Sequence, residues 1–130
     1  MQTIELKTMV LGPKTGKSTF IKEITSIDNN SLNTNTTLGV EVTPFDIHTH
    51  NGKRRLIFWE VGSQYKGLKN EYCIGANLAI IFKKTNTNEH LEYEDWLPNN
   101  IPRIYVNDYN ITQNDNIIQN IKNLITISLL

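Results

Sequence analysis

A glycine-bearing turn early in the chain combines residue types that can bind phosphate. In a phosphate loop of the Walker A type, backbone N–H groups and a helix N-terminus bind phosphate oxygens, a lysine reaches the β- and γ-phosphates, and a hydroxyl ligates Mg²⁺. Lys17 and Ser18 have the residue types for the last two roles, and Thr19 for a contact with an α-phosphate. The candidate phosphate-binding residues are Gly12, Pro13, Lys14, Thr15, Gly16, Lys17, Ser18 and Thr19.

This turn departs from the motif in two ways. The motif has four residues between its glycines, whereas three separate Gly12 from Gly16, and Leu11 stands where the first glycine would fall. Pro13 also removes one backbone N–H from the loop. A second interpretation therefore stays open, in which the segment is an ordinary strand-to-helix turn and Lys17 is a solvated side chain.

Hydrophobic periodicity places the turn between a strand and a helix. Residues 3–11 alternate and then become apolar, which is typical of a strand entering a core. Residues 18–27 have apolar side chains at helical spacing, and residues 28–37 are polar and predict a mobile loop. Residues 40–50 and 53–60 predict two strands joined by Asn51-Gly52, a signal for a type I′ hairpin turn.

Further elements follow this hairpin. Residues 78–82 are a continuous apolar run, typical of a strand buried on both faces, and residues 104–106 predict a short strand. Apolar residues between 117 and 125 have helical spacing, while residues 125–127 leave open a last strand. The pattern predicts a single α/β domain over residues 1–130, with a sheet covered on both faces.

Composition excludes several functional classes. The chain has 130 residues, and 13 basic residues balance 13 acidic ones, so it lacks the cationic surplus of a nucleic-acid binder. No apolar run is long enough to span a membrane. The single cysteine, Cys73, excludes an internal disulfide framework and suits a reducing compartment.

Beyond the phosphate loop, the chain resembles the small GTPases of the Ras superfamily, and within them the Ran branch. Residues 37–42, Thr-Leu-Gly-Val-Glu-Val, are similar to that branch's switch I and second strand, and residues 58–64, Phe-Trp-Glu-Val-Gly-Ser-Gln, to its Trp-Asp-Thr-Ala-Gly-Gln segment. Residues 67–82 and 100–102 extend the resemblance. It implies a reduced P-loop small G domain with a mostly parallel sheet, one antiparallel strand and no last helix, which binds GTP or GDP and Mg²⁺.

The resemblance also implies individual roles. Gln64 would be the catalytic residue that orients the attacking water. Ser18 and Thr37 would ligate Mg²⁺, and Glu60 stands where the family has an aspartate that holds the ion through water. Ser63 stands where the family has a glycine whose N–H meets the γ-phosphate, and Gly62 is the alternative for that role.

The base-reading segment departs further from the family. Small GTPases read guanine with Asn-Lys-x-Asp, whereas residues 107–110 here are Asn-Asp-Tyr-Asn. Asn110 offers one acceptor and one donor where an aspartate accepts two hydrogen bonds, and Asp108 replaces the lysine that stacks on the base. The family's second base loop would fall near Ser128. The further nucleotide-binding residues implied are Thr37, Ser63, Asn107, Asp108, Asn110 and Ser128.

Two functions follow as alternatives. The first is a Ran-like, GTP-binding switch with weak or absent hydrolysis in nucleocytoplasmic transport, found in cytoplasm and nucleus (of a host cell if the gene is viral). Its partners would be guanine nucleotide and nuclear transport receptors or Ran regulators, with no nucleic acid and no membrane. The second is a non-catalytic pseudo-GTPase that copies Ran surfaces and binds its partners. A switch with altered base preference, set by Asn110, is a third possibility.

The remaining polar clusters favour structural interpretations. His48 and His50 could form a metal pair, but without a nearby carboxylate or cysteine they indicate an exposed hairpin face. His90 is interpreted as a loop residue. Glu92, Glu94 and Asp95 are interpreted as a solvated face beside Trp96.

Overall fold

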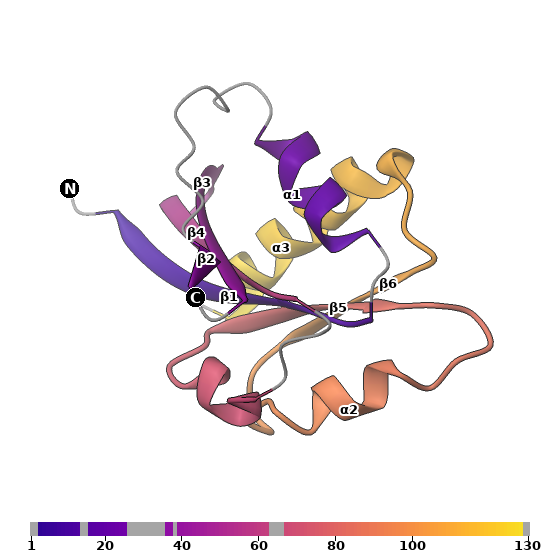
Figure 1. Cartoon of the computed structure of the whole chain (residues 1–130). Helices are drawn as coiled ribbons and strands as arrows, with labels where there is room; N and C mark the ends of the chain where they lie inside the picture. Colours follow the sequence, from indigo (N-terminus) through magenta and orange to yellow (C-terminus); the bar gives the residue numbers. More distant parts are fainter. Residues whose placement is uncertain (1–2, 14–15, 26–35, 38, 63–66, 129–130) are drawn as a thin grey trace.

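The computed structural model in Figure 1 describes residues 3–13, 16–25, 36–37, 39–62 and 67–128. The elements in chain order are β1 (Ile4–Leu11), α1 (Lys17–Ile24), β2 (Thr36–Thr37), β3 (Val40–Thr49), β4 (Gly52–Val61), the 3-10 helix η2 (Lys69–Cys73), β5 (Leu78–Lys83), α2 (His90–Glu94), β6 (Arg103–Asn107), the 3-10 helix η3 (Ile111–Gln113) and α3 (Asn114–Ser128).

The strands form one mixed sheet in the order β2-β3-β4-β1-β5-β6. β1 lies parallel to β4 on one side and to β5 on the other, and β5 is parallel to β6. β3 is antiparallel to both β4 and β2. This confirms the predicted α/β class with a mostly parallel sheet, and the arrangement is compatible with a P-loop-type domain.

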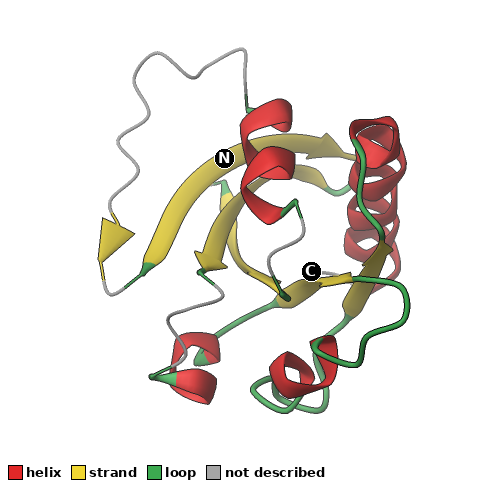
Figure 2. Ribbon diagram, turned by 45° about the vertical axis from the view of Figure 1, so that its right-hand side comes forward, coloured by secondary structure: helices red, strands yellow, loops and turns green. Residues whose placement is uncertain are grey.

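Helices cover both faces of the sheet (Figures 1 and 2). Alternate strand residues point to opposite faces, so Val10 of β1 belongs to the core beneath α1 and α3, whereas Met9 belongs to the core beneath η2 and α2. Residues 78–82 of β5 are all buried, as their continuous apolar run predicts. The central strands are therefore enclosed, and their carboxyl ends emerge between the two helical layers.

In the structure, the helix predicted over residues 18–27 ends earlier than predicted. α1 ends at Ile24, with Thr25 as its C-cap. Ile27 and residues 28–35 of the predicted mobile loop lie outside the described residues.

The alternative of a last strand over residues 125–127 is wrong, because α3 continues through them to Ser128. Ile117, Ile121 and Ile125 are buried at successive four-residue intervals. This helical stripe outweighs the β-branched character of Ile125-Thr126-Ile127, since tertiary burial overrides local propensity.

The predicted hairpin is confirmed, but the prediction of a type I′ turn at Asn51-Gly52 is wrong. Thr49 pairs with Gly52, so His50 and Asn51 occupy the turn positions. A type I′ turn needs positive φ at both, whereas only Gly52 has it here, at 107°. The Thr49 side chain holds this geometry, because its hydroxyl accepts from the Asn51 N–H at 3.1 Å and donates to the Gly52 carbonyl at 2.8 Å.

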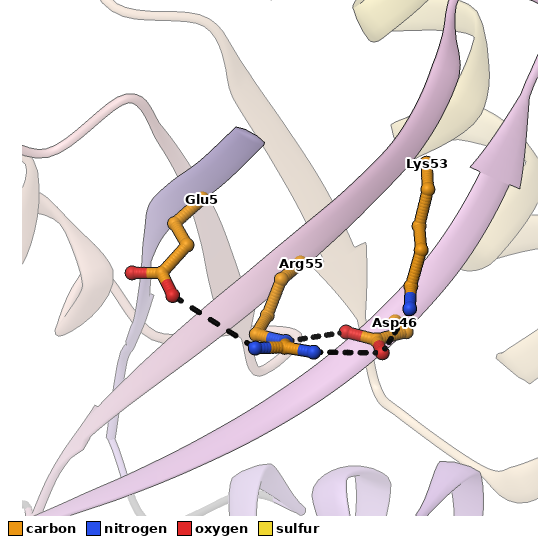
Figure 3. A network of polar contacts seen from close by, with 4 residues as sticks. All are labelled: Glu5, Asp46, Lys53 and Arg55. Carbon is orange, nitrogen blue, oxygen red and sulfur yellow. Dashed lines mark hydrogen bonds and ion pairs between the residues drawn. The ribbon is translucent and has the colours of Figure 1, made fainter. Parts of the chain in front are cut away.

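An ion network crosses the outer face of the hairpin (Figure 3). The Arg55 guanidinium donates to both carboxylate oxygens of Asp46, at 2.7 and 3.2 Å, and Lys53 Nζ lies 3.2 Å from the same carboxylate. Glu5 Oε2 lies 4.0 Å from the Arg55 guanidinium. The hydrogen bonds from Arg55 lower the pKa of Asp46 from 3.8 to about 2.

We expect Asp46→Asn to lower the free energy of unfolding at pH 7 by about 0.5 kcal/mol, a small loss because this pair is solvent-accessible. The contribution of Asp46 is fully present above its unfolded pKa of 3.8 and is lost as pH falls through about 2. The difference between wild type and variant should therefore vanish in strong acid. Urea unfolding across pH 2–7 measures it, with Asp95→Asn as the control at an exposed carboxylate. A difference that keeps its full size down to pH 2 would contradict this account.

Candidate phosphate-binding site

The candidate loop connects the carboxyl end of β1 to α1. Leu11 is the last, fully buried residue of β1, and the chain leaves the sheet at Gly12. Gly16 is the N-cap of α1, and its carbonyl accepts the first helical hydrogen bond from Phe20 N–H at 2.9 Å. The described part of this segment therefore has the strand–turn–helix context that the sequence predicts. Lys14 and Thr15 lie outside the described residues.

Both glycines are required by positive φ and by close neighbours. Gly12 has φ 134°, and a Cβ there would lie 2.4 Å from the carbonyl oxygen of Phe82 in β5. Gly16 has φ 91°, and a Cβ there would lie 2.5 Å from Cδ2 of Tyr109. The turn therefore lies tightly between the end of β5 and the segment after β6. Gly12 makes the sharp departure from the strand in a loop one residue shorter than the motif.

Lys17 is buried, with 5% of its surface exposed, so the interpretation of a solvated lysine is wrong. Its Nζ donates to the Gly12 carbonyl at 2.6 Å and to the Pro13 carbonyl at 2.9 Å. Burial lowers its pKa from 10.5 to about 8, against the opposing attraction of Glu60. An ammonium can donate three hydrogen bonds, and within the described residues Lys17 makes these two, both to uncharged oxygens. A buried charge of this kind favours an anionic ligand.

Ser18 and Glu60 bring two oxygen ligands together beside Lys17. Ser18 Oγ donates to Glu60 Oε2 across α1 and β4. Glu60 is 8% exposed, and burial raises the pKa of its carboxyl despite that hydrogen bond. Mg²⁺ favours such hard oxygen donors and is commonly held by one or two carboxylates plus substrate phosphates. The donor chemistry of this pair therefore fits Mg²⁺. Among the described residues, no group of three or more His, Cys, Asp or Glu side chains is arranged to hold a metal ion.

The described parts of the segments that resemble the two switches, residues 39–42 and 58–62 with the backbone of Thr37, lie on the same side as this pair. Thr37 is in β2 and pairs with Val40, which in turn pairs with Val61 next to Glu60. The Gly62 N–H donates to the Gly39 carbonyl at 2.9 Å, so it is already bonded and does not point to an open anion site. The side chain of Thr37, together with Ser63 and Gln64, lies outside what the structure describes.

The segment after β6 contacts the phosphate loop through Tyr109, which the sequence interpretation did not select. Its ring centroid lies 5.5 Å from that of Phe82 and 6.0 Å from that of Phe20, and its hydroxyl donates to Asn114 Oδ1 at 2.6 Å. An aromatic residue inside the segment aligned with the base-reading motif was the one available signal. Tyr109 fixes the position of this segment against Gly16.

The other residues of this segment bond to their own surroundings. The Asp108 carboxylate accepts from the Thr85 N–H at 2.8 Å and from the Thr85 hydroxyl, and these bonds lower its pKa. Asn110 is the N-cap of η3. Asn107 is the exposed last residue of β6, and its carbonyl accepts from Gln113. The structure thus brings Asn107, Asp108 and Asn110 to the same edge of the sheet as the loop.

Ser128 is not brought to that edge. α3 begins beside Tyr109 at Asn114, and near its other end the Ile125 carbonyl accepts from Asn51 Nδ2 of the hairpin turn at 3.3 Å. The last residue of α3 therefore lies toward the opposite edge of the sheet. His90 also differs from its interpretation as a loop residue. It begins α2, is 8% exposed, and its Nδ1 has no hydrogen-bond partner in the described part of the chain.

The mixed sheet, the strand–turn–helix and the buried lysine together are compatible with a P-loop-type α/β domain. No family model matches the chain. Within the described residues, no helix is long and apolar enough to cross a membrane.

Proposed function

We propose that this chain is a nucleotide-dependent switch that binds the di- or triphosphate of a nucleotide with Mg²⁺ at residues 12–19, as in the Ran-like small GTPases that it resembles. The observation that carries the proposal is Lys17, a buried ammonium bonded to two carbonyls of its own loop. A phosphate would supply the anionic partner that a buried cation requires. Thr19, exposed on α1 two residues further on, would supply a further phosphate contact.

The position of the loop in the sheet supports the same proposal. In open α/β sheets, ligands bind outside the carboxyl ends of the strands, where the chain connections leave in opposite directions. α1 follows β1 over one face, whereas α2 follows the neighbouring β5 over the other face (Figure 1). Gly12 lies between the ends of these two strands, so the loop is at such a switch point.

The metal and the switch segments would lie on the β4 side of Lys17. Mg²⁺, when bound, would neutralise charge on the phosphates, with Ser18 and Glu60 as its protein ligands and Thr37 as a further one. The γ-phosphate would order Thr37 and residues 60–64, which is how small GTPases couple nucleotide state to shape. Gln64 would orient the attacking water, and hydrolysis would be slow without an arginine from a partner. Nuclear transport receptors and Ran regulators are the partners proposed.

A specific observation favours a second candidate, a pseudo-GTPase that binds transport partners without nucleotide. Lys17 bonds to Gly12 and Pro13, and Ser18 bonds to Glu60, so groups of the protein itself partly satisfy the polar side chains of the loop. A loop stabilised in this way could serve only to shape a binding surface. The two candidates differ in whether nucleotide binds at all.

Titration of a fluorescent GTP analogue with Mg²⁺ tests the proposal. We expect saturable binding by wild type and a loss of at least about 30-fold in Lys17→Ala, because removing one partner of a buried charge pair costs about 2–5 kcal/mol. Lys122→Ala in α3 is the matched control and should bind like wild type. Saturable binding that Lys17→Ala leaves intact would place the ligand elsewhere. Absence of binding by wild type, with nucleotide-independent capture by transport receptors, would leave the second candidate.

A further inference from the structure

We infer that this site recognises the polyphosphate and its metal and does not select guanine, so that GTP, ATP and inorganic tripolyphosphate bind with similar affinity. The inference rests on the proposed function, because it concerns the ligand of the same loop. It is argued from the hydrogen bonds that the loops around the site already make.

The orientation of a bound nucleotide follows from the groups that lie on either side of Lys17. Ser18 and Glu60, the oxygen pair that suits Mg²⁺, lie on the β4 side. The metal binds at the terminal phosphates, so the remainder of a nucleotide would extend the other way, over the carboxyl ends of β5 and β6. The side chains at those ends include Thr85, Asp108 and Asn110, and all three are exposed.

Asp108 is directed toward β5. Its backbone has φ 45°, and both carboxylate oxygens are engaged by Thr85, one by the N–H at 2.8 Å and the other by the hydroxyl. The Asp108 N–H in turn donates to the Lys83 carbonyl at 2.9 Å. These bonds tie the segment after β6 to the end of β5 and use the only carboxylate of residues 107–113.

Asn110 is directed toward η3. Its Oδ1 accepts from the Thr112 N–H at 2.9 Å and from the Thr112 hydroxyl, while its own N–H donates to Gln113 Oε1 at 3.0 Å. This reciprocal arrangement is a capping box, which satisfies backbone groups at the start of a helix. The acceptor oxygen of Asn110 is therefore committed to the helix start.

The guanine edge presents N–H donors and needs acceptors in return. Two side-chain acceptors near this edge, on Asp108 and Asn110, are already oriented by their bonds to Thr85 and Thr112. Because these side chains are also exposed, water competes for any contact that they could make with a base. A site discriminates strongly only when a wrong ligand leaves buried polar groups unpaired. The buried group here is Lys17, which contacts phosphate and is the same for every nucleotide.

Competition against a fluorescent nucleotide tests this inference, using the wild-type protein with Mg²⁺ and GTP, ATP or tripolyphosphate as competitors. We expect the three inhibition constants to agree within about threefold, as phosphate-dominated recognition requires. A preference for GTP of about tenfold or more over both competitors, which corresponds to about 1.4 kcal/mol, would overturn the inference and leave the proposed function standing. Absence of binding by all three would overturn both.

Asn110→Asp tests whether the side chain at residue 110 caps η3 or faces the base. Aspartate is as good an N-cap as asparagine, so we expect its carboxylate to stay on Thr112 and the ratio of GTP to ATP affinity to remain within about twofold of wild type. If residue 110 instead faced the base, the new carboxylate would raise that ratio tenfold or more, by analogy with other specified polar contacts. Asn99→Asp, at an exposed turn, is the charge-matched control.

Discussion

Replacing Lys17 by methionine is expected to stabilise the protein near neutral pH while it abolishes polyphosphate binding. The side chain is 5% exposed, and its pKa is lowered from 10.5 to about 8 by burial. At about 1.4 kcal/mol per pH unit, a shift of that size costs the folded state about 3 kcal/mol when Lys17 is charged. Methionine avoids this cost but leaves the carbonyls of Gly12 and Pro13 without their donor, so a net gain of about 1–2 kcal/mol is expected.

The pH dependence of the stability difference between wild type and Lys17→Met shows whether the buried charge causes it. Between pH 8 and 10.5 the unfolded chain holds a proton on Lys17 that the folded chain has released, so the stability of wild type rises with pH across that window. The advantage of Lys17→Met should therefore be full below pH 8, vanish within this window and reverse by pH 10.5, where wild type has regained about 3 kcal/mol and keeps its two hydrogen bonds. Urea unfolding of both proteins at several pH values measures it. A constant difference across the window would show that packing, rather than the buried charge, separates them.

The affinity of wild type for tripolyphosphate should also depend on the protonation of Lys17. It is expected to be flat below pH 8, where Lys17 is charged, and to fall by up to about tenfold per pH unit above it. An affinity that stays flat to pH 10 would remove Lys17 from the site. If Lys17 lowers stability and is needed only to bind the ligand, it has the properties expected of a functional residue.

The framework of the fold could be predicted from local patterns. The apolar run of β5, the hairpin of β3 and β4 and the glycine-bearing turn before α1 each depend on residues close in sequence. The end of α3 was ambiguous, because Ile125-Thr126-Ile127 suits a strand by propensity and a helix by spacing. Only the packing of Ile117, Ile121 and Ile125 against the sheet decides between them.

The candidate site was predictable at its phosphate end and not at its base end. Gly12, Gly16 and Lys17 are neighbours in sequence, so their types and spacing indicate one loop. By contrast, the bond between Asp108 and Thr85 joins residues 23 positions apart. The approach of Tyr109 to Gly16 likewise joins segments that only the folded sheet brings together. Alignment with the base-reading motif assigned Asp108 and Asn110 to a ligand without showing which protein groups they already bond.

Alanine at Gly12 is expected to destabilise the protein more than alanine at Gly16, with losses of about 4 and about 2–3 kcal/mol in the free energy of unfolding. The Cβ at residue 12 would meet a backbone oxygen of Phe82 that the sheet fixes, whereas the Cβ at residue 16 would meet the side chain of Tyr109. Gly75→Ala supplies the reference for strain alone, because Gly75 has φ 77° with no atom within 4 Å of the added Cβ. It should cost about 1 kcal/mol.

A double-mutant cycle with Tyr109→Ala resolves the two contacts. Removal of the ring takes away the obstacle at residue 16, so Gly16→Ala should cost at least about 1 kcal/mol less in the Tyr109→Ala background than in wild type. Gly12→Ala should show no such coupling, because its obstacle is the Phe82 carbonyl. Equal coupling at both glycines would mean that the loop moves as a unit. In that case, the close contacts of the loop with β5 and Tyr109 would not be what fixes the position of the Lys17 ammonium.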